Sequence, residues 1–267
     1  MNPDFSRLGA RKLVREWAAR GRYLFSTAEV VRELGVSGAA ARAALRRLKA
    51  KGEIATPYRG FHLFVPPEYQ ALGCLPPEQF VPELMDRLSV VYYAGLLTAA
   101  RYHGAAHQQP QQFQVVVPKN RPSIRCGRVV VDFVARRNAR EMPTVQVNTP
   151  RGYLRVSSPE ATAFDLVGYP DRCGGLDNVA TVLAELAEKL DAQRLAEVAP
   201  LSPIPWAQRL GYLLERLGQS SRAEPLAAFV AQRATETASL VPGGERGDAP
   251  RNERWKLRIN SDVEPDL

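Results

Sequence analysis

Cysteine and histidine are scarce in this sequence, with three of each among 267 residues. Cys74, Cys126 and Cys173 are far apart and odd in number, so they predict neither a metal site nor a disulfide framework. We expect small, partly buried side chains in a reducing cytoplasm. No apolar run approaches the length that spans a bilayer, and the first seven residues lack the apolar core of a signal peptide. The sequence therefore predicts a soluble, cytoplasmic protein.

The motifs of common enzyme classes are also missing. There is no phosphate-binding Gly-Lys-Ser/Thr loop, dinucleotide glycine fingerprint or Gly-x-Ser-x-Gly elbow. His103 and His107 have the spacing of two metal ligands on a helix but lack the glutamate of a metalloprotease, so we expect hydrogen bonding at a helix end. Asp132 lacks the acid-x-Lys pair of a nuclease, and Asp165 is expected to be exposed or paired with an arginine. These absences predict no catalytic residue, metal or cofactor.

What the sequence does contain is a segment, residues 26–66, with the pattern of a helix-turn-helix followed by a β-hairpin. Ser26 and Glu29 form a capping box, which predicts a helix that begins at Thr27. Gly35 can adopt the left-handed conformation that ends such a helix.

A second helix is predicted between the cap Ser37 and the terminator Gly52. Its small and apolar residues fall on one side. The positions i, i+4 and i+7 on the other side form a basic stripe, made of Arg42, Arg46 and Lys49.

Two strand-like runs, residues 54–56 and 61–65, flank a tight turn at Gly60. This order of elements is that of a winged helix, whose second helix enters the major groove while the wing contacts the backbone. The predicted DNA-binding residues are Ser37, Arg42, Arg46, Arg47, Lys49, Lys51, Tyr58 and Arg59.

The charge distribution favours the same interpretation. Residues 1–69 carry a net charge of +7, whereas the whole chain carries +8. A solvated helix face would explain a single basic run. Here the charge coincides with the helix that the motif places in the groove, which favours a polyanion partner.

Two domains are predicted, a winged helix-turn-helix over residues 1–69 and a larger domain over residues 80–267. The proline pairs at 66–67 and 76–77 mark the boundary. A helix over residues 6–20 is expected to pack beneath the winged helix. The second domain is predicted to be α+β, a small, mostly antiparallel sheet with packed helices.

Within the second domain, residues 82–104 are expected to be mostly helical, and Ser158 with Pro159 predicts another helix start. Residues 231–251 are polar and rich in glycine and proline, which predicts a loose linker. Residues 254–260 alternate apolar and basic side chains, which predicts a strand that docks on this domain.

Charge is also segregated inside the second domain. Residues 119–155 carry a net charge of +7 and residues 156–197 carry −5. The basic region could be neutralised by the acidic one within the domain, or it could form a second surface for a polyanion or an acidic partner. Both interpretations stay open. The candidate surface residues are Lys119, Arg121, Arg125, Arg128, Arg136 and Arg137.

Several runs of the sequence together resemble a known family. They are residues 92–104, 109–110, 113–117, 156–167, 174–177, 208–214 and 255–266, with the wing at 60–69. In these runs the chain resembles the AbiEi family, the antitoxins of AbiE-type abortive-infection systems. The resemblance covers most of the chain, and only the combination of runs is specific.

The resemblance implies a bacterial antitoxin with two domains. In it, the N-terminal winged helix binds inverted repeats in its own promoter and represses the operon. The C-terminal domain counters a cognate toxin of the nucleotidyltransferase fold, with or without a stable complex. The family motif supplies no catalytic residue. Two alternatives stay open: a regulator in which residues 80–230 sense a small molecule, or a nucleic-acid-processing enzyme.

Overall fold

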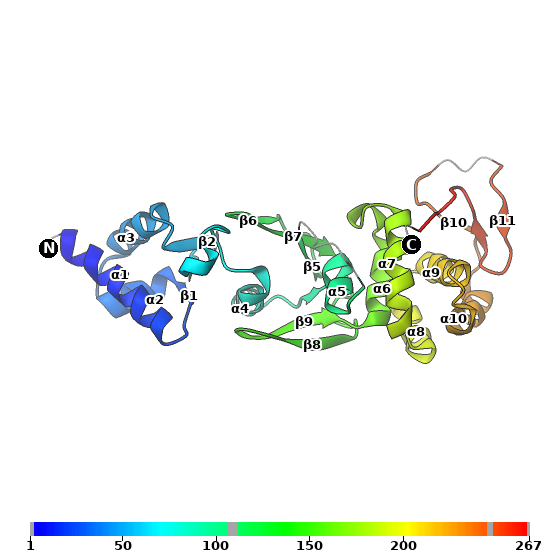
Figure 1. Cartoon of the computed structure of the whole chain (residues 1–267), viewed down its shortest axis with the longest axis horizontal. Coiled ribbons are helices and arrows are strands. Elements are labelled where there is room, and N and C mark those ends of the chain that lie inside the picture. Colours follow the sequence, from blue (N-terminus) through cyan, green and yellow to red (C-terminus); the bar gives the residue numbers. More distant parts are fainter. Residues whose placement is uncertain (1–2, 106–111, 245–247, 266–267) are drawn as a thin grey trace.

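The computed structural model describes residues 3–105, 112–244 and 248–265. The first three helices lie at one end of an elongated molecule, and the last two helices with a small C-terminal sheet lie at the other (Figure 1). A six-stranded sheet occupies the middle. The predicted α+β class is therefore confirmed. Every helix in the described part of the chain is too short or too polar to traverse a lipid bilayer.

The helix-turn-helix is built by its local capping signals. It contains α1 (Pro3–Ala19), α2 (Thr27–Leu34) and α3 (Gly38–Ala50). The Ser26 hydroxyl accepts a hydrogen bond from Glu29 N at 3.2 Å, and Ser26 N donates to Glu29 Oε2 at 2.6 Å. Gly35 ends α2 at φ 60°, and the Ser37 hydroxyl caps α3. The predicted boundaries of α2 and α3 are found within about two residues, and α1 begins three residues before its predicted start at residue 6.

Three strands form the wing, in the spatial order β1-β3-β2. They are β1 (Leu24–Ser26), β2 (Ile54–Tyr58) and β3 (Phe61–Phe64), and both pairs are antiparallel. Phe25 and Ile54 join the apolar sides of the three helices in one core. Burial of these side chains fixes the wing beside α3.

The central sheet has the strand order β6-β7-β5-β4-β9-β8. Its strands are β4 (Tyr93–Ala94), β5 (Phe113–Val117), β6 (Ile124–Cys126), β7 (Val129–Ala135), β8 (Thr144–Thr149) and β9 (Gly152–Ser157). The pairs β5–β7 and β4–β9 are parallel, and the other three are antiparallel.

The expectation that residues 82–104 are mostly helical is wrong in the middle of that range. The helices are α4 (Val81–Arg87) and α5 (Leu96–Tyr102), and β4 lies between them. Tyr93 and Ala94 pair with β5 on one side and Ala94 pairs with β9 on the other. A short apolar run does not distinguish a buried strand from a buried helix. Here the pairing with β5 and β9 makes residues 93–94 a strand.

Five helices cover one end of the sheet and continue beyond it (Figure 1). They are α6 (Pro159–Gly168), α7 (Leu176–Leu186), α8 (Ala192–Val198), α9 (Ile204–Arg216) and α10 (Ser220–Arg233). The Ser158 hydroxyl caps α6 by accepting from Ala161 N at 3.2 Å, with Pro159 in the first turn. These helices share the largest apolar core of the described residues.

The described residues of the predicted linker, 231–244 and 248–251, include regular structure. α10 extends to Arg233, the strand β10 (Ala238–Ser239) follows, and Leu240 is fully buried. Of residues 254–260, only Leu257–Arg258 form a strand, β12, which pairs with β10 and with β11 (Arg251–Asn252). Trp255 lies in a turn and is fully buried against Gly211 of α9. The buried side chains of Leu240 and Trp255 thus anchor the C-terminal segment on the helical core.

The two halves share a core at their junction. Residues 66–80 contain two short 3₁₀ turns, η1 (Pro67–Tyr69) and η2 (Pro77–Gln79). Leu63 of the wing belongs to the same apolar cluster as Phe80 and Val131 of the second half. The division into domains at residues 1–69 and 80–267 stays a prediction, and either part alone would expose some of this cluster.

Candidate nucleic-acid interface

The basic stripe lies on the exposed side of α3. Arg42, Arg46 and Lys49 are all exposed, whereas Leu45 and Leu48 are buried on the opposite side. Among the described residues, none of the three cations forms an ion pair. Three unneutralised cations on one helix side make this surface attractive to phosphate groups.

The other predicted residues of α3 have different surroundings. The Ser37 hydroxyl accepts a hydrogen bond from Ala40 N, so its role is that of a helix cap. Arg47 is half-buried, and its Nε is buried without a partner among the described residues. Lys51 is exposed at the C-terminal end of the helix. Ser37 thus has a structural role as a cap, and Arg47 is less accessible than the residues of the basic stripe.

A shallow hollow of about 170 Å³ lies between α3 and the wing. Arg42, Arg46 and Lys49 line it, and His62 lies in its wall, 8% exposed. The His62 ring nitrogens are 2.9 Å from Thr27 Oγ1 and 3.0 Å from Thr56 Oγ1. The hollow brings the basic stripe and the base of the wing together.

His62 is held in its neutral form. Burial, followed by the charge of Lys49, lowers the pKa of His62 from 6.5 to about 4. A neutral imidazole donates through one nitrogen and accepts through the other, which matches one threonine on each side. Sequence reasoning missed this polar centre because His62 lies in an otherwise apolar strand and one of its partners, Thr27, is 35 residues away.

The wing tip carries Tyr58 and Arg59, which are both exposed. Gly60 has φ 75°, the left-handed conformation that closes the turn after Arg59. The β2–β3 register shifts between Ala55 and Tyr58, so the tip departs from regular pairing. Arg59 therefore projects beyond the strand pair.

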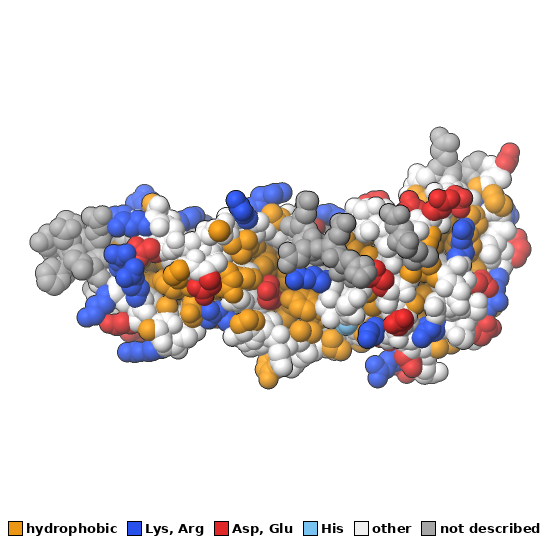
Figure 2. All heavy atoms as spheres, in the orientation of Figure 1, with side chains coloured by type: hydrophobic (Ala, Val, Ile, Leu, Met, Phe, Trp, Pro, Cys, Tyr) orange, Lys and Arg blue, Asp and Glu red, His pale blue; other side chains and the backbone are white. Residues whose placement is uncertain are grey.

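A second hairpin, β6–β7, lies beside the wing. Arg128 N donates a hydrogen bond to Leu72 O at 2.8 Å, and β6 is adjacent to β2. The side chains of Arg125 and Arg128 are exposed on this hairpin. In Figure 2, Lys and Arg side chains follow the upper edge of the molecule from the region of α3 to that of β6. Basic charge therefore continues past the wing onto the second half.

The prediction that Arg136 belongs to an exposed basic surface is wrong. Its side chain is 4% exposed and forms an ion pair with the buried Asp165. It also donates to Ser202 Oγ at 2.8 Å and Leu201 O at 3.0 Å, and lies 5.0 Å from the ring centroid of Trp206. The buried acid satisfies the charge of Arg136, which explains its place in the core.

The remaining candidates of the basic surface fall into two groups. Arg125 and Arg128 lie at the hairpin tip, where β6 meets the start of β7. Lys119 and Arg121 follow β5, whose last residue pairs with the end of β7, and Arg137 follows β7 itself. Arg121 is half-buried and the other four are exposed. The strand β7 thus separates a group near the wing from a group farther away.

Residues weighed for catalysis have structural partners. His103 Nε2 lies 2.7 Å from Ser157 O at the end of α5, as expected, whereas His107 lies outside the described residues. Asp132 forms an ion pair with Arg172, and Asp165 is buried, not exposed, with its predicted arginine partner. In the described ranges, no cluster of three acidic, histidine or cysteine side chains is arranged to hold a metal ion.

Comparison with known proteins gives two family matches. Residues 93–216 match the model of the AbiEi antitoxin C-terminal domain. Residues 12–65 match the model described as a transcriptional regulator, AbiEi antitoxin. The second match spans α2, α3 and the wing, and the first spans the central sheet and α9.

A solved structure has a similar fold. It is the crystal structure of the RV2827C protein from Mycobacterium tuberculosis, which matches with a TM-score of 0.65 and 19% sequence identity. The match covers 94% of this chain and 90% of that chain. No protein of curated function matches the sequence.

Proposed function

Since the chain belongs to the AbiEi family of antitoxins and transcriptional regulators, we propose that it represses its own operon and counteracts a toxin of the nucleotidyltransferase fold encoded beside it. The observation that carries the DNA-binding part is the exposed stripe of Arg42, Arg46 and Lys49 on α3. The chain uses no catalytic residue in this role, and its partners are operator DNA and the toxin.

The DNA contacts follow from the arrangement of α3 and the wing. The N-terminal half of α3, with Arg42, enters the major groove, where an arginine fork can read a guanine edge. Lys49 and Arg59 contact phosphates on either side and set the position of the helix without reading sequence. The two hydrogen bonds of His62, to Thr27 and Thr56, hold the base of the wing against the start of α2.

The DNA-binding surface extends to the β6–β7 hairpin in this proposal. Arg125 and Arg128 are exposed next to the wing, so a duplex that follows the wing passes them. They contribute two further phosphate contacts. This assignment takes them from the antitoxin surface and leaves Lys119, Arg121 and Arg137 as the group offered to the toxin or to its nucleic-acid substrate.

The test of DNA binding uses the full-length chain and its own promoter fragment. A triple variant, Arg42→Ala with Arg46→Ala and Lys49→Ala, should lose at least about 3 kcal/mol of binding free energy, because a base-reading arginine contributes about 1–3 kcal/mol. Circular dichroism checks that the variant is folded. Unchanged affinity of a folded triple variant for the promoter would refute the assignment of α3.

The antitoxin role is tested separately by growth rescue in cells that express the neighbouring toxin. The charge-reversed chain Lys119→Glu, Arg121→Glu and Arg137→Glu should fail to rescue growth while it still binds the promoter. The triple alanine variant of α3 is the matched control, and it should rescue when it is expressed from an independent promoter. Full rescue by the charge-reversed chain would exclude this surface.

A further inference from the structure

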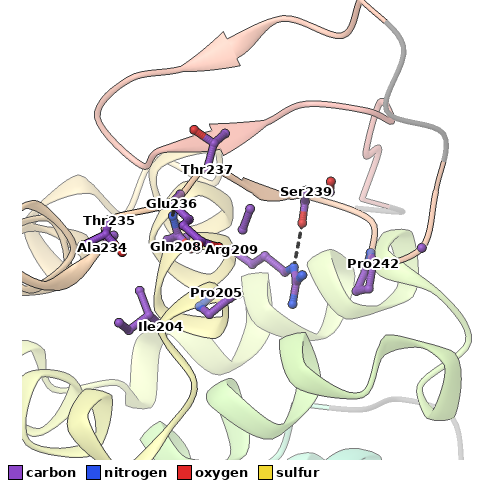
Figure 3. A pocket seen from close by; sticks show the side chains of 12 residues that line it. Ile204, Pro205, Gln208, Arg209, Ala234, Thr235, Glu236, Thr237, Ser239 and Pro242 are labelled. Atoms are coloured by element: carbon purple, nitrogen blue, oxygen red, sulfur yellow. Dashed lines mark hydrogen bonds between the residues drawn. The ribbon is translucent and has the colours of Figure 1, made fainter.

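A pocket of about 430 Å³ lies between α9 and the segment that leads into β10. Ile204 and Pro205 form its apolar floor, and Thr235, Thr237 and Ser239 lie along its other side (Figure 3). Its volume is in the range of pockets that bind small molecules. The pocket lies at the opposite end of the molecule from α3, so it does not belong to the DNA-binding surface (Figure 1).

Arg209 of α9 enters this pocket from one wall (Figure 3). The residue is only 7% exposed. Its Nε donates a hydrogen bond to Ser239 O at 3.0 Å. Within the described ranges, neither terminal nitrogen of the guanidinium has a hydrogen-bond or ion-pair partner. A buried cation without a counter-charge is unusual because its desolvation is costly.

Arg136 is also buried, but its surroundings differ from those of Arg209. An acid, a hydroxyl and two carbonyl or amide oxygens satisfy its guanidinium. Burial lowers the pKa of Arg209, and no carboxylate in the described part of the chain opposes that shift. Among the described residues, the buried Arg136 thus has a full set of partners, whereas the terminal nitrogens of Arg209 have none.

The rest of the pocket is held in place by polar contacts. Gln208 Nε2 donates to Glu236 O at 3.2 Å and to Lys256 O at 2.8 Å, which fixes the segment before β10 on α9. The Nε–Ser239 contact holds the Arg209 fork in one orientation. Glu236 lies at the pocket with an exposed side chain and forms no ion pair with Arg209. The site is therefore preorganised around its cation.

We propose that this pocket binds the phosphate group of a small phosphate ester, with Arg209 as the principal ligand. The two terminal nitrogens of a guanidinium match two oxygens of a phosphate. A phosphate ester carries about 1.5 to 2 negative charges at pH 7, against one for a carboxylate, so the Arg209 guanidinium favours the phosphate. The remaining volume accommodates the group esterified to the phosphate.

The test titrates the full-length chain, free of DNA, with sodium phosphate, adenosine monophosphate and sodium acetate at constant ionic strength. Isothermal titration gives the affinity, and amide chemical shifts of Thr237 and Ser239 locate the binding. Phosphate should bind more tightly than acetate. Tighter binding of adenosine monophosphate than of inorganic phosphate identifies an ester as the ligand. Equal affinity for the two identifies the free anion.

Three variants make the result specific. Arg209→Met should weaken phosphate binding by at least about tenfold, the effect of losing a charge-assisted hydrogen bond. The matched control Arg233→Met removes an exposed arginine at the end of α10 and should bind phosphate as the wild type does. Glu236→Gln removes a negative charge that repels an anion in the pocket, so it should tighten phosphate binding by about two- to fivefold.

Several outcomes would overturn the proposal. They are equal phosphate affinity of wild type and Arg209→Met, acetate binding as tight as phosphate, and no shift at Thr237 and Ser239 in the wild type. The wild-type shifts and the Glu236→Gln titration decide the matter even if Arg209→Met does not fold. Promoter binding by Arg209→Met should be unchanged, so failure here is distinct from failure of the DNA-binding proposal.

Discussion

Arg136 donates a hydrogen bond to the carboxylate of Asp165, and the pair is buried where the end of β7 meets α6. The Tyr93 hydroxyl donates to the second oxygen of Asp165 at 2.9 Å. Burial raises the pKa of Asp165, while the charge of Arg136 and the two hydrogen bonds oppose this shift. The pair thus connects the sheet, through Tyr93 and Arg136, to the helical layer.

Removing one partner of this pair should destabilise the fold severely. Arg136→Met and Asp165→Leu should each lower the free energy of unfolding by about 3–5 kcal/mol, because each leaves an uncompensated buried charge. The double variant should lose much less than the sum of the two. Urea denaturation of the four proteins measures the coupling. Additive losses, or single losses below about 1 kcal/mol, would contradict the role of the pair.

The wing tip and the hairpin should contribute phosphate contacts without sequence preference. Arg59→Ala and Arg128→Ala should each weaken binding to promoter and unrelated DNA alike, and each should reduce the salt slope by about one unit. Arg140, an exposed arginine beyond the end of β7, supplies the control substitution Arg140→Ala. A loss confined to the promoter would instead mark the mutated residue as a reader of bases.

Acid should destabilise the winged helix through His62. The folded-state pKa, about 4, is below the ordinary value of 6.5 because His62 is buried. Between these values the unfolded chain binds more protons than the folded one. The contribution of His62 to the free energy of unfolding is therefore fully present above pH 6.5. It decreases as the pH falls towards 4, by about 3 kcal/mol in all.

Chemical denaturation at pH 7.5, 5.5 and 4.5 measures this loss in the wild type. His62→Gln keeps one donor and one acceptor but cannot be protonated, so its stability should fall less over the same range. Parallel curves for the two proteins would show that other groups cause the acid sensitivity.

The packing of Trp255 on α9 should depend on the absence of a side chain at Gly211. A Cβ at this position would overlap the ring of Trp255. Gly211→Ala should therefore displace Trp255, with a red shift of its fluorescence and a lower free energy of unfolding. In an ordinary helix the same change stabilises by roughly 0.5–1 kcal/mol.

Gly9→Ala in α1 is the control for this prediction, since the added Cβ would meet Leu34 at an ordinary 3.5 Å. It should be neutral or stabilising. Similar stabilisation by both substitutions would mean that the Trp255 ring does not need to pack closely on α9.

The parts of the fold that were predicted correctly depend on local signals. The Ser26–Glu29 capping box and the cap at Ser158 act over three residues, so a single sequence reveals them. The strand at Tyr93 and the burial of Arg136 depend instead on partners that are 22 or more residues away, namely Val116 and Asp165. No local pattern separates a solvated arginine from one that neutralises a distant buried acid.

The thiols illustrate the same limit. The sequence predicted neither a metal site nor a disulfide framework for Cys74 and Cys126, and their two thiols are neighbours at the contact between Gly73 and Gly127. The hydrogen bond with Cys74 lowers the pKa of Cys126, although burial opposes the shift. The close approach of two glycines, 54 residues apart, creates this neighbourhood, and nothing in the spacing of the cysteines indicates it.

The shared core at residues 66–80 bears on how this chain can be re-engineered. Leu63 and Val65, at the end of the wing, and Leu75 and Phe80 after it belong to one apolar cluster with residues of the central sheet. A chimaera that exchanges the DNA-reading part at residue 69 would cut this cluster and bring two unmatched apolar faces together. Operator specificity should therefore be transferred by exchanging the exposed side chains of α3, with the scaffold beneath them left intact.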